Sequence, residues 1–422
     1  MNYAIFQFTF LLLGCSLAID TLTGFFVSGL GIDLKLSAMF KFTLLIIMIF
    51  ALACYSRKNI IILFSLMLIL LIGPLFNLIN TYDVMGFLFD FSYVIKILTP
   101  LIIFLFSVEI IKRWPDNAYK YGLKVFYFSF GVLLFNIAAG ILGFGFSSYN
   151  TKDGEVSIGI KGFFYAGNEV SGLFILLFSF ILSAAWNSKR KIYYLIMAPI
   201  TVMCGILIAT KAAMIAGLLL VVLIPLVNER NKMFNLTWLK ISIFSPALVG
   251  FMAIIYFAVP ILQATGIWDR LVWFYEKKGV FGIIFSGRNE FAVATLDSFY
   301  KHAGAVESLF GIGLSGLAKI ERATVEIEPI DMYFWFGIPG IVYLIAIFSA
   351  FIYMSYRAAL KKISFWAPFA LVANILLFGL SFIAGHTLTS GMLAPLWGLL
   401  NGMVYVEYSR YMAKNKTVNA HA

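Results

Sequence analysis

The chain has 422 residues, of which 62% are hydrophobic and only 12% are charged, with a mean hydropathy of +0.96. A soluble domain is about 25% charged, so this composition excludes a soluble enzyme, a secreted protein and a disordered protein. The net charge of +11 is explained by basic loops that orient membrane helices, rather than by nucleic acid binding.

Apolar stretches long enough to cross a bilayer recur along the chain. A spanning helix needs about 20 mostly apolar residues. Twelve segments meet this requirement, and the first of them is the least certain. They lie at roughly 3–19, 36–54, 60–79, 91–111, 123–146, 168–186, 192–209, 212–227, 241–262, 337–356, 365–385 and 387–406. The sequence therefore predicts an all-α polytopic membrane protein.

Lys and Arg are concentrated in alternate loops and in the C-terminal tail. The opposite short loops hold only Lys35, Lys152, Lys161 and Lys211. The positive-inside rule then puts both termini in the cytoplasm. We expect helices 1–9 over 1–262, a large extracytoplasmic loop over 263–336, helices 10–12 over 337–406 and a cytoplasmic tail over 407–422.

A few ionisable residues lie at the predicted outer ends of the spans. They are Glu169 in GNEVS, Lys211 in ATKAA and His386 in AGHTLTSG; Asn168 stands beside Glu169. Charge at membrane depth is costly and is by default a candidate functional site. We expect Asn168 and Glu169 to line a pocket at this end.

The large loop supplies Arg288 in SGRNE, and Glu328 and Asp331 at the start of the tenth span. Arg and Lys bind phosphates, so Arg288 and Lys211 are candidate ligands of a lipid-linked diphosphate. A carboxylate or His386 would take the proton of an attacking sugar hydroxyl. The candidate catalytic residues are Arg288, Glu328, Asp331 and His386.

Each candidate also has a structural explanation. In this alternative interpretation, Arg288 only pairs with a loop acid, Lys211 anchors a hairpin by snorkelling, and Glu169 complements a helix dipole. His386 hydrogen-bonds across helices, and Glu328 and Asp331 cap a helix or are solvated. The pair EIE at 326–328 is the nearest match to a metal-binding DxD, and we expect neither a metal nor a cofactor.

The chain resembles the O-antigen polymerase and O-antigen ligase superfamily, which includes Wzy-type polymerases. The resemblance extends from about residue 160 onward. It rests on FFYAGNEVSGLF, IATKAAMIAGLL, SGRNE, ESLFGIGLSG, EIEPIDMYFWFGIPG and GHTLTSG, in that order. It implies a GT-C-like fold in the bacterial inner membrane. It also implies inverting, metal-independent glycosyl transfer, with undecaprenyl-diphosphate-linked glycans as donor and acceptor.

The resemblance is partial. Arg288 matches the loop Arg of the family, whereas Lys211 stands where the family often has Arg. Ligases of the family carry a His before the span that follows the loop, but no His lies between 303 and 385. This difference favours a polysaccharide polymerase over a ligase and leaves the general base open. A lipid-linked sugar flippase is the alternative from another class, and a chain-length regulator is a candidate partner.

Overall fold

The computed structural model describes residues 3–150, 157–165, 167–229 and 287–420, with isolated residues between 238 and 285. Eight helices in this part are long and apolar enough to cross a membrane, and two apolar helices are shorter. The chain is therefore an all-α polytopic membrane protein, as predicted. The expected number of twelve spans stays a prediction, because the segment 241–262 lies outside the described residues.

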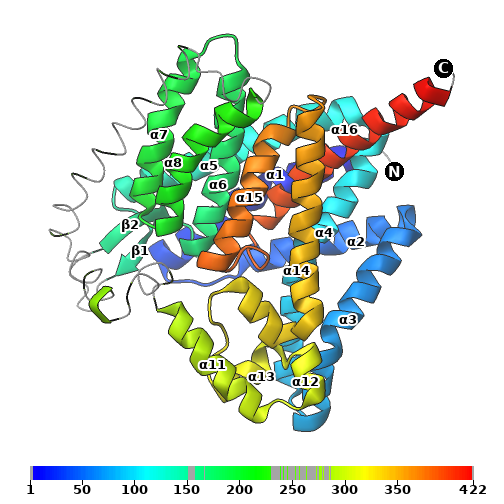
Figure 1. The fold of residues 1–422 in the computed structure, drawn as a ribbon, viewed down its shortest axis with the longest axis vertical. Helices are drawn as coiled ribbons and strands as arrows, with labels where there is room; N and C mark the ends of the chain where they lie inside the picture. Colours follow the sequence, from blue (N-terminus) through cyan, green and yellow to red (C-terminus); the bar gives the residue numbers. More distant parts are fainter. Residues whose placement is uncertain are drawn as a thin grey trace.

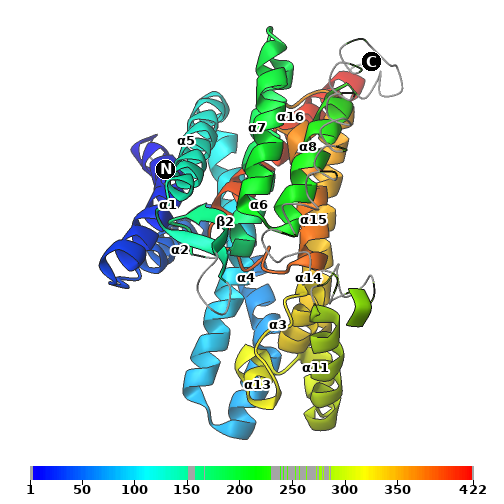
Figure 2. The same ribbon diagram turned by 90° about the vertical axis from the view of Figure 1, so that its left-hand side faces the viewer.

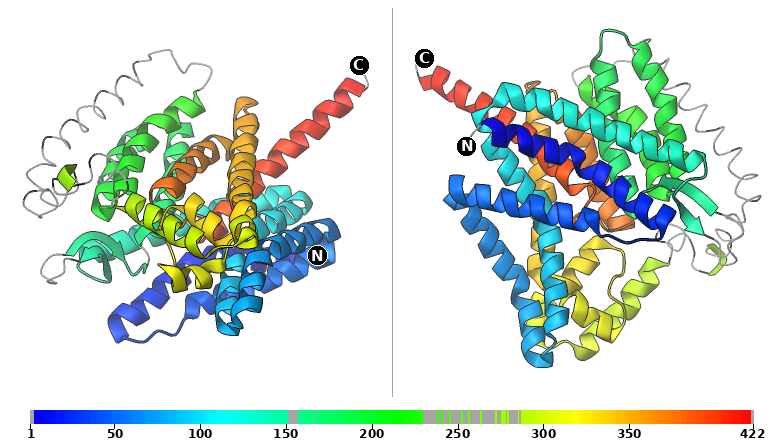
Figure 3. Two further views of the ribbon diagram at one scale, coloured as in Figure 1. Left: turned by 60° about the horizontal axis from the view of Figure 1, so that its bottom comes forward. Right: turned by 180° about the vertical axis from the view of Figure 1, so that it is seen from behind.

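The N-terminal helices form two layers of the bundle. They are α1 (Tyr3–Leu30), α2 (Leu36–Tyr55), α3 (Arg57–Thr81), α4 (Val84–Arg113) and α5 (Pro115–Ile141). Seen from behind, α1, α2 and α5 cover the face opposite the C-terminal helices (Figure 3). The helices α3 and α4 extend downward as a pair beyond the rest of the bundle (Figure 1).

A short antiparallel hairpin, β1 (Phe146–Asn150) and β2 (Ser157–Gly162), follows α5. Three helices come next, α6 (Gly167–Asn187), α7 (Ile192–Ile208) and α8 (Lys211–Asn228). The hairpin lies against the ends of these helices (Figure 2). Ser148 donates to the carbonyl of Ile208 at 2.8 Å, which fixes the hairpin to the α7–α8 turn.

The described part of the predicted large loop is itself helical. It contains α11 (Arg288–His302), α12 (Ala305–Phe310) and α13 (Gly313–Ile320). These helices gather beside the lower ends of α3 and α4 (Figures 1 and 2). We call this end of the bundle the loop side. The described chain ends, near Tyr3 and Ala420, lie towards the other end.

The last three helices form the centre of the molecule. They are α14 (Glu328–Leu360), α15 (Ala367–Ile383) and α16 (Ala394–Ala420). A buried polar network joins them, since Asn374 hydrogen-bonds Asn401 at 2.9 Å and the indole of Trp397 at 2.6 Å. Interhelical hydrogen bonds of this kind add stability and specify packing in a membrane.

Glycines join the loop helices to the bundle. Gly337 has φ 61 and ψ −147 and divides α14 into a short first part and a long second part. A Cβ at Gly337 would lie 2.1 Å from the carbonyl oxygen of Leu309, and one at Gly311 (φ 77) would lie 2.4 Å from the carbonyl carbon of Trp335. The backbones of the α12–α13 turn and of α14 are therefore in direct contact, which only glycine permits at these angles.

Each predicted span other than 241–262 coincides with a helix, but some boundaries were wrong. The first helix continues to Leu30 instead of stopping at 19, and α14 begins nine residues before the predicted 337. The last two predicted spans, 365–385 and 387–406, are joined by a ten-residue non-helical connection, 384–393, instead of the single residue between the predicted ranges. This connection is called the junction loop below.

Candidate active site

The junction loop, 384–393, links α15 to α16, and charged side chains from four other helices lie against it or its first flanking residue. Two successive residues, Gly385 (φ 62) and His386 (φ 60), adopt the left-handed conformation. Strained residues of this type persist only where surrounding contacts hold them, and they cluster at functional sites. The contacts are described below in the order of the loop.

Arg288 is held at the start of the junction loop. Its Nε and Nη2 donate to Oε2 of Glu326 at 2.9 and 2.6 Å, and its Nη1 donates to the carbonyl of Ile383 at 2.7 Å. The guanidinium is 17% exposed and the carboxylate 34%. An arginine has five N–H donors, so this geometry leaves two for a ligand. Arg288 can therefore pair with a loop acid, as predicted, and still have N–H groups available for a phosphate.

Glu328, the first residue of α14, is 2% exposed and holds the middle of the loop. Its Oε1 accepts from the backbone N–H of Leu388 at 2.7 Å. Oε2 has no partner of normal hydrogen-bond geometry, although Thr387 is close enough to influence the carboxyl. The direct effect of Glu328 is therefore to fix the backbone that carries His386.

Asp331 is also 2% exposed, and both of its oxygens are used. Oδ1 accepts from Val325 N at 2.6 Å and Oδ2 from Glu326 N at 2.9 Å. These bonds hold Glu326 at φ 65, an angle that is uncommon for a residue with a side chain. Asp331 thereby positions Glu326. The catalytic role predicted for Glu328 and Asp331 stays a prediction, and their geometry favours positioning.

His386 lies among the charges of Glu326, Glu169 and Arg288. Burial is the largest influence and lowers the pKa of His386 below its usual value. The two carboxylates oppose this shift, and Arg288 adds to it. His386 is consequently neutral at pH 7 and can accept a proton there.

Glu169, in the first turn of α6, contacts the end of the junction loop. Its Oε2 accepts from Ser390 Oγ at 2.8 Å and from Met392 N at 3.3 Å. Lys211 starts α8, and the preceding Thr210 hydrogen-bonds Ser171 of α6 at 2.7 Å. Lys211 thus stands beside the helix of Glu169, whereas Arg288 is at the other end of the loop. The side chain of Asn168 lies outside the described residues.

The sequence analysis missed two charged residues that meet at the same loop. Lys41 of α2 pairs with Asp20 of α1, with Nζ 2.5 Å from Oδ1. A Cβ at Gly391 of the junction loop would lie 3.1 Å from this Nζ. Both residues fall within or next to predicted apolar spans, and that placement was the available signal.

A comparison with protein families finds a match in the C-terminal part of the chain. Residues 269–407 match the family described as O-antigen ligase like membrane protein. This match supports the O-antigen ligase and polymerase superfamily. It covers roughly a third of the chain, and the motifs between 160 and 268 lie outside it. No curated protein matches the chain.

The part that resembles the O-antigen ligase family contains Arg288, Glu326, Glu328, Asp331 and the whole junction loop. It includes the helices from α11 to α15 and the first half of α16. The family match supports the general part of the prediction, that the protein is a membrane enzyme of polysaccharide assembly. Glu169, Lys211 and Lys41 come from outside the matched segment and complete the surroundings of the loop.

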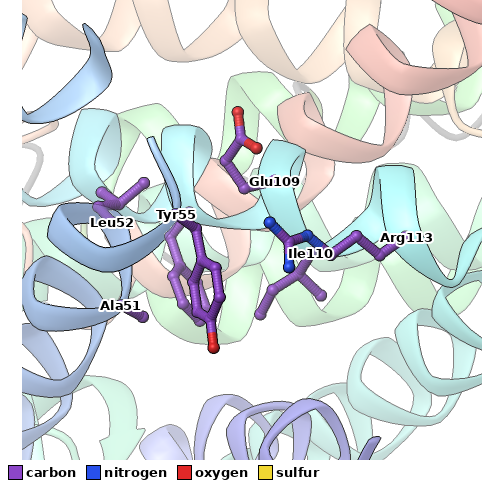
Figure 4. A pocket seen from close by; sticks show the side chains of 7 residues that line it. Ala51, Leu52, Tyr55, Glu109, Ile110 and Arg113 are labelled. Carbon is purple, nitrogen blue, oxygen red and sulfur yellow. The ribbon is translucent and has the colours of Figure 1, made fainter. Parts of the chain in front are cut away.

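Two hollows of the structure lie away from the junction loop. One is a small cavity of about 10 Å³ between the far ends of α2 and α4, where Arg113 stacks over Tyr55 at 4.4 Å (Figure 4). The other is an apolar groove between α1 and α5; it is lined by Ala18, Thr21, Tyr127, Phe128, Gly131, Val132 and Phe135. Neither contains a residue of the Arg288 site.

Among the residues that the structure describes, no group of three or more His, Cys, Asp or Glu side chains could hold a metal ion. The two carboxylates of the EIE string have different partners. Glu326 binds Arg288, and Glu328 binds the backbone of Leu388. The chemistry that this site can perform is therefore best argued from its cations, carboxylates and imidazole.

Proposed function

We propose that this protein is a membrane glycosyltransferase that polymerises undecaprenyl-diphosphate-linked repeat units into a surface polysaccharide. The observation that carries the proposal is the meeting of Arg288, Glu326 and His386 at the junction loop. The family match supports the general class. The site would face the periplasm of the bacterial inner membrane, with both termini in the cytoplasm.

Arg288 suits the leaving diphosphate. Two of its N–H groups remain after it binds Glu326 and Ile383, and a guanidinium binds phosphate oxygens in a bidentate way. Its contacts hold it in place before substrate arrives, so little reorganisation is needed when negative charge develops. Glu326 partly neutralises the guanidinium and so favours release of the product diphosphate.

In the proposed reaction, a hydroxyl oxygen of the acceptor sugar attacks the anomeric carbon of the donor. A new glycosidic C–O bond forms while the bond from that carbon to the diphosphate oxygen breaks. The leaving diphosphate keeps the electron pair, and the anomeric centre is inverted. The hydroxyl proton passes to a base, and no metal is required.

His386 and Glu326 are the two candidates for this base. His386 is neutral because burial lowers its pKa. Glu326 is 34% exposed, whereas Glu328 and Asp331 are each 2% exposed. Glu328 and Asp331 are nearly fully buried and bound to backbone N–H groups. A base must reach the hydroxyl directly or through one water molecule, which favours His386 and Glu326.

Replacement of Arg288 tests the proposal. When the Arg288→Ala variant is expressed in a strain that lacks the protein, it should insert into the membrane. It should not restore long polymer, so that glycan gels show single repeat units. We expect a loss of activity of at least about a hundredfold, as for removal of other groups that stabilise developing charge. Lys301→Ala, an exposed lysine on the same helix, is the matched control and should support normal polymer.

The same gels separate polymerase from ligase. Accumulation of long lipid-linked polymer in the deletion strain would indicate a ligase instead. Purified protein in liposomes with lipid-linked repeat units provides the second distinction. Elongation indicates an enzyme, and translocation without elongation indicates a flippase. Normal long polymer from Arg288→Ala would show that the proposed site is wrong.

A further inference from the structure

The corner between α2 and α3 lies against the last turn of α4, at the end of the bundle opposite the loop helices. Arg113 of α4 stacks over Tyr55, the last residue of α2, with its Cζ 4.4 Å from the ring centre. Asn59 of α3 donates to Oε1 of Glu109 of α4 at 3.3 Å. These two contacts fix the corner against α4 on both sides of the turn between α2 and α3.

Four exposed cations gather at this contact, and we call them the corner cations. They are Arg57 and Lys58, which open α3, and Lys112 and Arg113, which close α4. Within the described ranges, one carboxylate pairs with them, since Oε1 of Glu109 lies 3.8 Å from Nζ of Lys112. Asp116, the next acid along the chain, opens α5 and leaves the balance positive.

Helix electrostatics explains two of the corner cations and not the other two. Lys112 and Arg113 stand in the last turn of α4, where the helix dipole favours positive charge. Arg57 and Lys58 stand in the first turn of α3, where the dipole disfavours positive charge, and that turn contains no acid. An anion from outside the chain would stabilise this pair.

The guanidinium of Arg113 is oriented without using its donors. Stacking on Tyr55 engages the flat face of the group (Figure 4). In the part of the chain that the structure describes, its five N–H groups make no hydrogen bond or ion pair. They are therefore available to phosphate oxygens, which a guanidinium binds in a bidentate way. Tyr55 acts as a positioning residue for this cation.

The surface next to the corner cations is apolar. The small cavity that Arg113 lines is walled mainly by apolar side chains, those of Ala51, Leu52, Phe106 and Ile110. Exposed Phe50 on α2 and Ile61 on α3 continue the apolar surface away from the cations. Both helices are long and apolar enough to cross a membrane. The corner cations thus stand at the end of a lipid-facing surface, where phospholipid headgroups lie.

We propose that the corner cations bind the phosphate of an anionic phospholipid, whose acyl chains lie along the exposed apolar faces of α2 and α3. Basic sites between membrane helices attract such headgroups, because each Lys or Arg near the surface adds to the attraction. The bound lipid neutralises the corner and joins it to the end of α4. The proposal is independent of the proposed reaction, because the site is remote from the junction loop.

Native mass spectrometry of the purified full-length protein tests the site. The micelles contain equal amounts of phosphatidylglycerol and phosphatidylcholine with identical acyl chains, and we expect the wild type to retain phosphatidylglycerol preferentially. The double variant Arg57→Gln, Arg113→Gln should weaken this retention by at least about tenfold, since each cation contributes about fivefold. The double variant Lys189→Gln, Arg190→Gln is the matched control and should keep it. It removes two exposed cations from the α6–α7 connection, on the same predicted side of the membrane.

The stacked ring separates a specific site from a surface that is merely cationic. Tyr55→Leu keeps every charge but releases Arg113, so the retention of phosphatidylglycerol should fall about threefold, as expected for an exposed cation–π contact. Thermal midpoints in phosphatidylcholine alone check that the variants fold. Unchanged retention by folded Tyr55→Leu would show that charge alone attracts the lipid and would overturn the specific site.

Retention equal to that of the wild type in the double variant Arg57→Gln, Arg113→Gln would overturn the proposal. An equal loss in the control Lys189→Gln, Arg190→Gln would overturn it as well. Glycerophosphoglycerol, the headgroup without acyl chains, is the last probe. If it displaced phosphatidylglycerol at an equal concentration, the site would bind a free phosphate anion and not a lipid.

Discussion

His386 is surrounded by groups of both signs on different helices. Glu326 precedes α14, Glu169 belongs to α6, and Arg288 begins α11. Burial lowers the pKa of His386 more than any single charge changes it. The imidazole is therefore kept neutral, while the two carboxylates are placed to stabilise the imidazolium that proton transfer would create.

The pH dependence of elongation follows from this environment. If neutral His386 is the base, the rate should be full at pH 7 and should fall only as pH drops through a pKa below 6.5. Glu326→Gln removes a charge that raises this pKa, so the acidic limb should move to lower pH. Initial rates of the purified enzyme between about pH 5 and 8 provide the measurement.

His386→Gln is the matching variant for this profile. It should lower the rate by about a hundredfold or more and remove the acidic limb. An unchanged limb in His386→Gln would mean that another group, with Glu326 the first candidate, accepts the proton. A limb that moves to higher pH in Glu326→Gln would contradict the electrostatic assignment.

At the residue scale, the structure brings Arg288, Glu169 and His386 to one junction loop. Glu169 and His386 were expected at span ends and Arg288 in the large loop, while their catalytic and binding roles stay predictions. The roles within 326–331 could not be predicted, because they depend on the turn at Glu326, with φ 65. A spacing of two residues does not indicate which carboxylate faces outward.

Helix α13 is attached to α4 by two acids that differ in burial. Asp90 is fully buried and accepts from Ser315 N at 2.8 Å and from Ser315 Oγ at 2.6 Å. Asp83, at the start of α4, pairs with Lys319 at 2.6 Å near the surface. The hydrogen bond from Lys319 is the main cause that lowers the pKa of Asp83. The buried acid is expected to matter more for stability than Asp83, which caps α4 by accepting from Gly86 N at 2.8 Å.

Replacing these two acids separately tests this difference. Asp90→Ala should lower the free energy of unfolding by about 2 kcal/mol, because it leaves buried donors of α13 without their acceptor. Asp83→Ala should cause a smaller loss, since it removes an exposed ion pair and one helix N-cap hydrogen bond, from Gly86 N. Thermal unfolding in detergent compares the two. A similar loss for both variants would show that exposure does not decide the contribution.

At the element scale, the long apolar helices were predictable and the short polar ones were not. Hydropathy identifies a span because about 20 consecutive residues must be apolar. The helices α11, α12 and α13 carry polar and charged residues and have no such window. The extension of α14 before Gly337 was missed for the same reason.

The whole molecule has a predicted orientation in the membrane. Lys and Arg are concentrated in the loops at the end of the bundle opposite α11–α13. The positive-inside rule therefore predicts that the loop side is extracytoplasmic. In a cysteine-free background, Tyr165→Cys on the loop side should react with a membrane-impermeant maleimide in intact cells, since Tyr165 is 74% exposed. Lys361→Cys, between α14 and α15, is the control and should react only after the cells are opened. The reverse pattern would invert the predicted topology.

Gly311, in the α12–α13 turn, is in direct backbone contact with α14 at Trp335. This contact limits which segments could be exchanged between this protein and a homologue. Leu309 and Gly337 are in contact across the same boundary. A chimera that takes only the region before α14 from a homologue would have to recreate this glycine-to-backbone fit with a foreign helix. Recombination, natural or engineered, should therefore succeed when its crossover points fall outside 288–393, so that the segment is inherited as one cassette.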